Sequence, residues 1–107
     1  DEYFTNLVIK RYKDLRKTVL SEEYILEYID QTVKYLGPAI ERNFEKWGYT
    51  FVSNKGMLEP AKRNLKSYEA ALNQLKEYII ARGKWIDENI DTLMQFSHES
   101  RNKPYNR

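Results

Sequence analysis

Residues 67–96, SYEAALNQLKEYIIARGKWIDENIDTLMQF, decide the fold class of this chain. Apolar side chains recur here in steps of three, four or seven residues, at Tyr68, Leu72, Leu75, Ile79, Ile86, Ile90 and Leu93. This spacing places one apolar stripe along an α-helix. A helix of about 30 residues is roughly 45 Å long at 1.5 Å per residue. Because a stripe of that length needs cover, the sequence predicts other helices packed against it.

The preceding part of the chain contains the segments that can cover this stripe. A first helix is predicted over residues 3–19, with apolar positions at Phe4, Leu7, Val8, Tyr12, Leu15 and Val19. Ser21 followed by Glu22 and Glu23 is typical of a helix start, because a serine side chain caps free backbone N–H groups. Gly37-Pro38 then predicts a kink, a break or the start of a new helix, which ends near Trp47.

Residues 48–66 have a different character, with glycine, asparagine, serine and proline between short apolar runs. They predict an irregular connection that contains a β-like run at 49–52 and a turn at 54–56. We expect Tyr49, Phe51 and Val52 to hold this loop against the core. A loop of that length is uncommon in a compact domain.

Two residues of the long helix indicate how it begins and packs. Ser67 is predicted to cap it, with Glu69 in the first turn. Gly83 costs a helix interior about 1 kcal/mol relative to alanine. The sequence leaves two explanations for it, a mild bend or the close approach of another backbone.

Composition limits the possible classes of protein. The chain of 107 residues is predicted to be all-α, a three- to four-helix bundle, with residues 1–97 as one helical subdomain and 98–107 as a polar tail. A net charge of +2 gives no electrostatic reason to expect nucleic acid. No apolar run of about 18 residues occurs, so no membrane span is predicted. Helical periodicity begins directly after Asp1, which suggests a piece of a longer protein.

A search for reactive side chains predicts no catalytic, cofactor-binding or metal-binding residue in this chain. There is no cysteine, and His98 is the sole histidine, in the polar tail. Asp87 and Asp91 share a helix face and could hold a hard cation, although charged residues are more often the solvated side of a helix. The best basic patch is diluted by Glu59 and lacks interleaved aromatic residues; it consists of Lys55, Lys62, Arg63 and Lys66.

Arginines among aromatic residues form three clusters, in 11–21, 41–48 and 81–90. Arginine stacks on rings and binds carboxylates through two nitrogens, so these residues are candidates for structural clamps. The candidates are Arg11, Arg16, Arg42, Trp47, Arg82, Trp85 and Asp87.

The same clusters, in order, resemble the C-terminal part of the CotH family, the spore-coat-protein-H-like kinases. The first part of the resemblance lies in Phe4, Leu7, Arg11-Tyr12, Leu15-Arg16, Leu20-Ser21, Ile25, Ile29-Asp30, Leu36, Ala39 and Arg42-Asn43-Phe44-Glu45-Lys46-Trp47. A variable loop follows, and then Ile79, Arg82, Trp85-Ile86-Asp87 and Asn89-Ile90. The ordered set covers most of residues 3–93.

The resemblance implies a non-catalytic helical part that braces the catalytic lobe of an atypical protein kinase. The parent would transfer phosphate from ATP to protein hydroxyls with the help of a divalent metal, and its nucleotide- and metal-binding residues would lie upstream. Expected partners are that upstream lobe and, for the parent, a protein substrate. The expected location is extracellular or at the cell surface, in a spore coat or secreted. The alternative is a stand-alone helical module that binds a partner protein without enzymatic activity.

Overall fold

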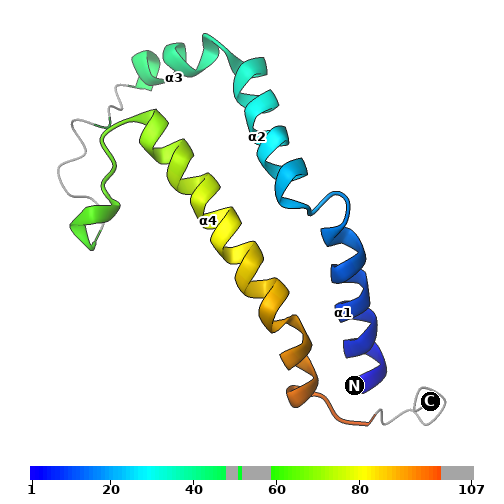
Figure 1. Ribbon diagram of the computed structural model, residues 1–107. Coiled ribbons are helices and arrows are strands. Elements are labelled where there is room, and N and C mark those ends of the chain that lie inside the picture. Colours follow the sequence, from blue (N-terminus) through cyan, green and yellow to red (C-terminus); the bar gives the residue numbers. More distant parts are fainter. Residues whose placement is uncertain (48–50, 52–58, 100–107) are drawn as a thin grey trace. The chain divides into compact units, whose positions relative to one another are not determined.

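The computed structural model describes residues 1–47, 51 and 59–99 of the chain. Every regular element in these ranges is helical (Figure 1): α1 (Glu2–Arg16), α2 (Glu22–Leu36), α3 (Ala39–Trp47), the short 3₁₀ helix η1 (Ala61–Arg63), α4 (Tyr68–Asn89) and the 3₁₀ helix η2 (Ile90–Phe96). The predicted all-α class with a long C-terminal helix is confirmed. In the described part of the chain, no helix is long and apolar enough to cross a bilayer.

The helix boundaries follow local chemistry. The Oγ atoms of Ser21 and Ser67 accept hydrogen bonds from the backbone N–H groups of Tyr24 and Ala70, at 3.2 and 3.0 Å, so both predicted caps are confirmed. Between α2 and α3, Gly37 has a φ of +45°, which glycine adopts without the steric cost of a side chain. The predicted break at Gly37-Pro38 is therefore confirmed, with a new helix directly after it.

Two predicted helices end earlier than expected. The first ends at Arg16 instead of residue 19, because Thr18 N–H bonds to the carbonyl of Leu15 in a tight turn. The long helix is α-helical only to Asn89 and continues as η2. The Asn89 side chain bonds to the carbonyl of Trp85, and Thr92 Oγ1 donates to the carbonyl of Asn89. Side-chain competition for these carbonyls favours the tighter 3₁₀ turn.

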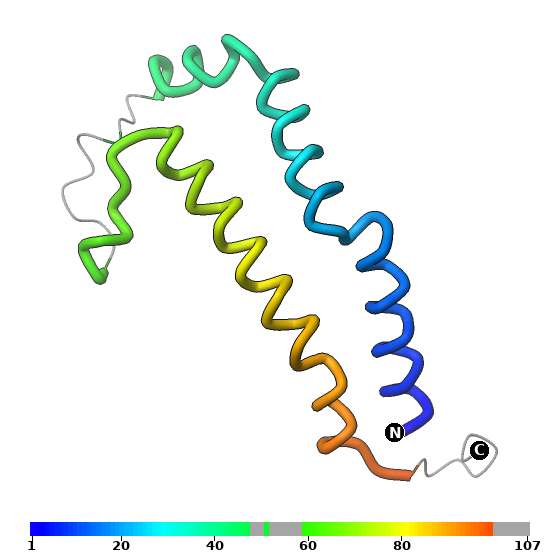
Figure 2. Tube along the Cα trace, viewed as in Figure 1, coloured from blue at the N-terminus to red at the C-terminus, as the bar shows by residue number. Residues whose placement is uncertain are grey.

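The chain divides into two compact units, the first made of Asp1–Ile25 and Ile80–Arg107. In this unit α1 lies beside η2 (Figure 2). Ile9 of α1 is buried, with 7% of its surface exposed, and the Glu2 N–H donates to the carbonyl of His98 at 2.9 Å. The backbone hydrogen bond joins the start of α1 to the residues that follow η2.

The second unit is Leu26–Ile79. The ring of Phe44 on α3 lies 5.6 Å from that of Phe51 and 6.0 Å from that of Tyr68, centroid to centroid. Lys76 of α4 forms an ion pair with Asp30 of α2. An apolar hollow of about 400 Å³ is lined by Leu36, Ala39, Ile40, Asn43, Phe44 and Tyr68.

The predicted loop at 48–66 is described only in part. Phe51 contacts Phe44, which agrees with the prediction that Phe51 holds the loop against the core. The predicted roles of Tyr49 and Val52, and the turn at 54–56, lie outside the described residues.

Candidate functional site: the Arg16 cluster

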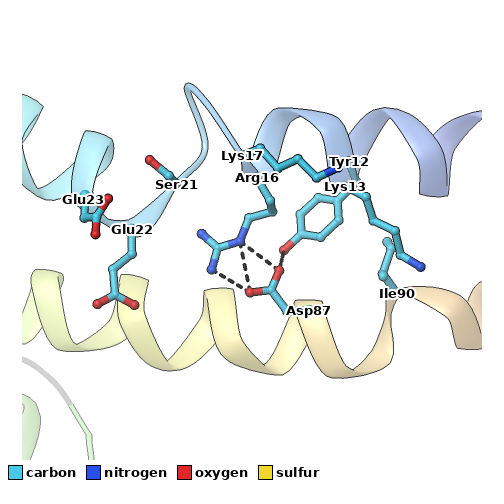
Figure 3. Close-up of a pocket in the computed structure, with 9 residues that line it drawn as sticks. All are labelled: Tyr12, Lys13, Arg16, Lys17, Ser21, Glu22, Glu23, Asp87 and Ile90. Atoms are coloured by element: carbon cyan, nitrogen blue, oxygen red, sulfur yellow. Dashed lines mark hydrogen bonds and ion pairs between the residues drawn. The ribbon is translucent and has the colours of Figure 1, made fainter.

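An open hollow of about 680 Å³ lies in the first unit, where α1 ends and α2 begins (Figure 3). Polar and charged side chains dominate its wall, which is formed by Tyr12, Lys13, Arg16, Lys17, Ser21, Glu22, Glu23, Asp87 and Ile90. Figure 3 shows Arg16 and Tyr12 pointing from α1 toward Asp87 on α4. This cluster is the candidate functional site.

Arg16 is the last residue of α1 and extends across to the last turns of α4. Its Nε atom donates to Asp87 Oδ1 at 2.8 Å and to Oδ2 at 3.1 Å, while Nη2 donates to Oδ2 at 2.7 Å. Nη1 donates to the carbonyl oxygen of Leu20 at 2.6 Å. One guanidinium therefore binds both a carboxylate of α4 and the backbone that connects α1 to α2.

Tyr12 completes the cluster one helical turn before Arg16. Its hydroxyl donates to Asp87 Oδ1 at 2.7 Å. Desolvation and this hydrogen bond raise the pKa of Tyr12 to about 12. The hydrogen bonds from Arg16, and then that from Tyr12, lower the pKa of Asp87. The carboxylate of Asp87 in turn raises the pKa of Arg16.

Gly83 makes room for this guanidinium. A Cβ atom at residue 83 would lie 3.0 Å from Nη2 of Arg16 and 3.4 Å from its Cζ. The sequence left two explanations open for this glycine, a mild bend or the close approach of another backbone. The three heavy atoms nearest to that Cβ all belong to the Arg16 side chain, so the group that approaches is a side chain and not another backbone. The mild bend stays a prediction.

Asp91 does not join the Asp87 cluster. It pairs with Lys13 Nζ at 2.7 Å, whereas Asp87 binds Arg16 and Tyr12. Across residues 1–47, 51 and 59–99, no three His, Cys, Asp or Glu side chains are grouped so as to hold a metal ion. The structure thus gives each of these two carboxylates its own cationic partner.

The other clamp candidates do not converge on Arg16. The guanidinium carbon of Arg82 lies 4.5 Å from the ring centroid of Trp85, so the two form an exposed cation–π pair on α4. Arg11, Arg42 and Trp47 are exposed on α1 and α3. A bracing role for these residues stays a prediction.

Sequence reasoning missed Tyr12 as a member of the cluster and singled out Gly83 without the side chain that approaches it. Tyr12 was assigned to the apolar side of its helix, although its position four residues before Arg16 places both on one face. No signal in the sequence identified Asp87 as the acid for Arg16, because the two residues are 71 positions apart.

The fold and this cluster define a helical protein segment stabilised by an interhelical charge cluster. The CotH family model, described as CotH kinase protein, matches residues 1–86. The chain therefore belongs to the CotH family. Comparisons with the curated proteins and with the solved structures give no significant match.

Proposed function

We propose that this chain is the non-catalytic helical C-terminal part of a CotH-like protein kinase and braces its catalytic lobe. The parent would transfer phosphate from ATP to protein hydroxyls, with a divalent metal bound upstream. Membership of the CotH family supports this assignment. It also supports an extracellular or cell-surface location, in a spore coat or secreted. Residues 1–97 would act as the bracing subdomain and 98–107 as a polar tail.

The observation that carries the proposal is the exposure of large apolar side chains. Within the described residues, Ile9 is the sole hydrophobic residue that is buried. Burial of one such side chain stabilises the folded state by about 1.5–3 kcal/mol. This is far below the free-energy cost of the conformational entropy that the chain loses on folding. Exposed apolar area of this kind marks a surface that another protein part covers.

Helix α1 shows these exposed apolar side chains most clearly. Its packed side carries Ile9, which is buried, and Tyr12 and Arg16, which bind Asp87 of α4. Phe4 and Leu7 lie on another side of the same helix and are 64% and 48% exposed. Helix α1 therefore has a second apolar stripe, which the proposal assigns to the catalytic lobe.

The proposal is tested on the full-length gene product. Its intact mass should include a lobe upstream of this segment, and the purified protein should transfer labelled phosphate from ATP to a protein hydroxyl. A full-length mass near that of this chain, or metal-supplemented protein that transfers no phosphate, would contradict the kinase assignment.

The bracing role needs a separate readout. A photo-crosslinking amino acid in place of Leu7 should attach to upstream residues of the same polypeptide. The same group in place of Asn6, which is exposed and lies on a different side of α1, should attach less. Attachment to a separate protein would favour the alternative, a stand-alone interaction module. The apolar hollow on α3 is the observation that favours this alternative.

A further inference from the structure

Arg16 connects three backbone segments through one side chain. It belongs to α1, donates from Nη1 to the carbonyl of Leu20, and binds Asp87 of α4. The side chain of Arg16 is only 18% exposed, whereas that of Asp87 is 41% exposed. The guanidinium is thus enclosed by the groups that it binds.

The residues after Arg16 form a short chain of hydrogen bonds that leads into α2. Thr18 and Leu20 N–H donate to the carbonyl of Leu15, and Ser21 N–H donates to the carbonyl of Thr18. Ser21 then caps the first turn of α2 through Tyr24 N–H. Because Arg16 holds the Leu20 carbonyl, its position affects each later bond of this connection.

Three other contacts of α1 use neither Arg16 nor Asp87, whereas the Tyr12 hydroxyl bonds to Asp87 and belongs with the Arg16 contacts. Lys13 pairs with Asp91, Ile9 is buried, and Glu2 N–H bonds to the carbonyl of His98. Loss of the Arg16–Asp87 contact would leave all three in place. The first unit therefore contains two separable sets of contacts.

We propose that Asp87, acting through Arg16, is a conformational latch that holds the α1–α2 connection and the first turn of α2 closed. When the latch is broken, residues 17–25 open together while α1 stays on η2. Asp87 is a positioning residue in this scheme, because it reaches the connection only through Arg16. The inference goes beyond the proposed function and does not depend on kinase activity.

Hydrogen–deuterium exchange on the full-length protein tests the latch. Asp87→Asn should raise the exchange of the Leu20, Ser21 and Ile25 amides on the order of tenfold, since about one charged hydrogen-bonded contact is lost. Amides in the middle of α1 should change less than about twofold. The matched control is Asp91→Asn, which removes a carboxylate four positions later and should leave residues 17–25 unchanged.

Two further variants keep the result interpretable. Asp87→Glu retains the carboxylate and should restore most of the protection. Arg16→Lys retains the charge but cannot bind Leu20 and Asp87 through a planar fork, so it should open the same residues; if Asp87→Asn does not fold, the exchange of Arg16→Lys decides the outcome. Equal acceleration throughout α1 and η2, or unchanged exchange at Leu20 and Ser21, would overturn the proposal.

Discussion

The guanidinium of Arg16 binds the carboxylate of Asp87 through two nitrogens, with Nε 2.8 Å from Oδ1 and Nη2 2.7 Å from Oδ2. This arrangement matches the planar fork of arginine to a planar carboxylate. It brings the end of α1 against α4 directly over Gly83. The stability of the first unit should therefore respond to changes at any of these three residues.

The first prediction concerns Gly83. In an ordinary helix interior, glycine to alanine stabilises by about 1 kcal/mol. Here the new methyl group would press on the held guanidinium of Arg16, so Gly83→Ala should give no gain or a net loss in the free energy of unfolding. Denaturant unfolding measures the effect.

The control for this prediction is the same change without the arginine. In an Arg16→Ala background, Gly83→Ala should recover the stabilisation of about 1 kcal/mol. Equal effects in both backgrounds would show that the two residues do not interact.

The second prediction concerns the ionisation of Tyr12. Its pKa of about 12, raised from 10.0, means that the folded state favours the protonated hydroxyl. The stability from this group is present below pH 10 and is lost as the pH rises toward 12. Ultraviolet titration should show a tyrosine that ionises near pH 12, and this signal should be absent from Tyr12→Phe. A titration in which Tyr12→Phe removes an early-ionising group would refute the prediction.

The third prediction concerns acid. The pKa of Asp87 is lower in the folded state than in the unfolded state, where it is about 3.9. The contribution of Asp87 to the free energy of unfolding is therefore present above about pH 3.9 and is lost as the pH falls through the pKa of the folded state. Asp87→Asn should cost about 1–2 kcal/mol near neutral pH, after allowance for solvent screening at this part-exposed site. The variant should also flatten the acid limb of a stability–pH profile.

The control for the acid prediction is again Asp91→Asn. Its ion pair is more exposed, with side-chain exposures of 49% for Lys13 and 68% for Asp91. Exposed pairs contribute about 0–1 kcal/mol. If Asp91→Asn lowered the free energy of unfolding as much as Asp87→Asn, the prediction that the Arg16–Asp87 pair is the more stabilising of the two would be wrong.

The fourth prediction compares Ile9 with Leu7, two neighbours on α1. Ile9→Ala should cost about 2–4 kcal/mol, because it removes methyl groups from a buried site. If the catalytic lobe covers the second stripe, Leu7→Ala in the full-length protein should cost more than about 1 kcal/mol, although Leu7 is 48% exposed in this chain. Thermal unfolding of the full-length variants measures both effects, and a loss near zero for Leu7→Ala would argue against cover at this stripe.

Local signals accounted for much of the fold. Ser21 and Ser67 were recognisable as caps because a cap depends on residues within one turn, and Gly37-Pro38 marked the break for the same reason. The site was harder to predict, since the choice of Asp87 as the partner of Arg16 depends on how two distant helices pack. The end of the α-helix at Asn89 was missed because the periodic apolar residues continue beyond it.

The 3₁₀ helix that follows Asn89 changes the geometry of the chain's C-terminal part. Seven residues of 3₁₀ helix advance about 14 Å, against roughly 10 Å for an α-helix of the same length. At three residues per turn, Ile90, Leu93 and Phe96 stand in one straight row instead of fanning around the axis. The tighter winding thus gives η2 a longer reach and a narrow apolar edge, where an α-helix would present a broader and shorter surface.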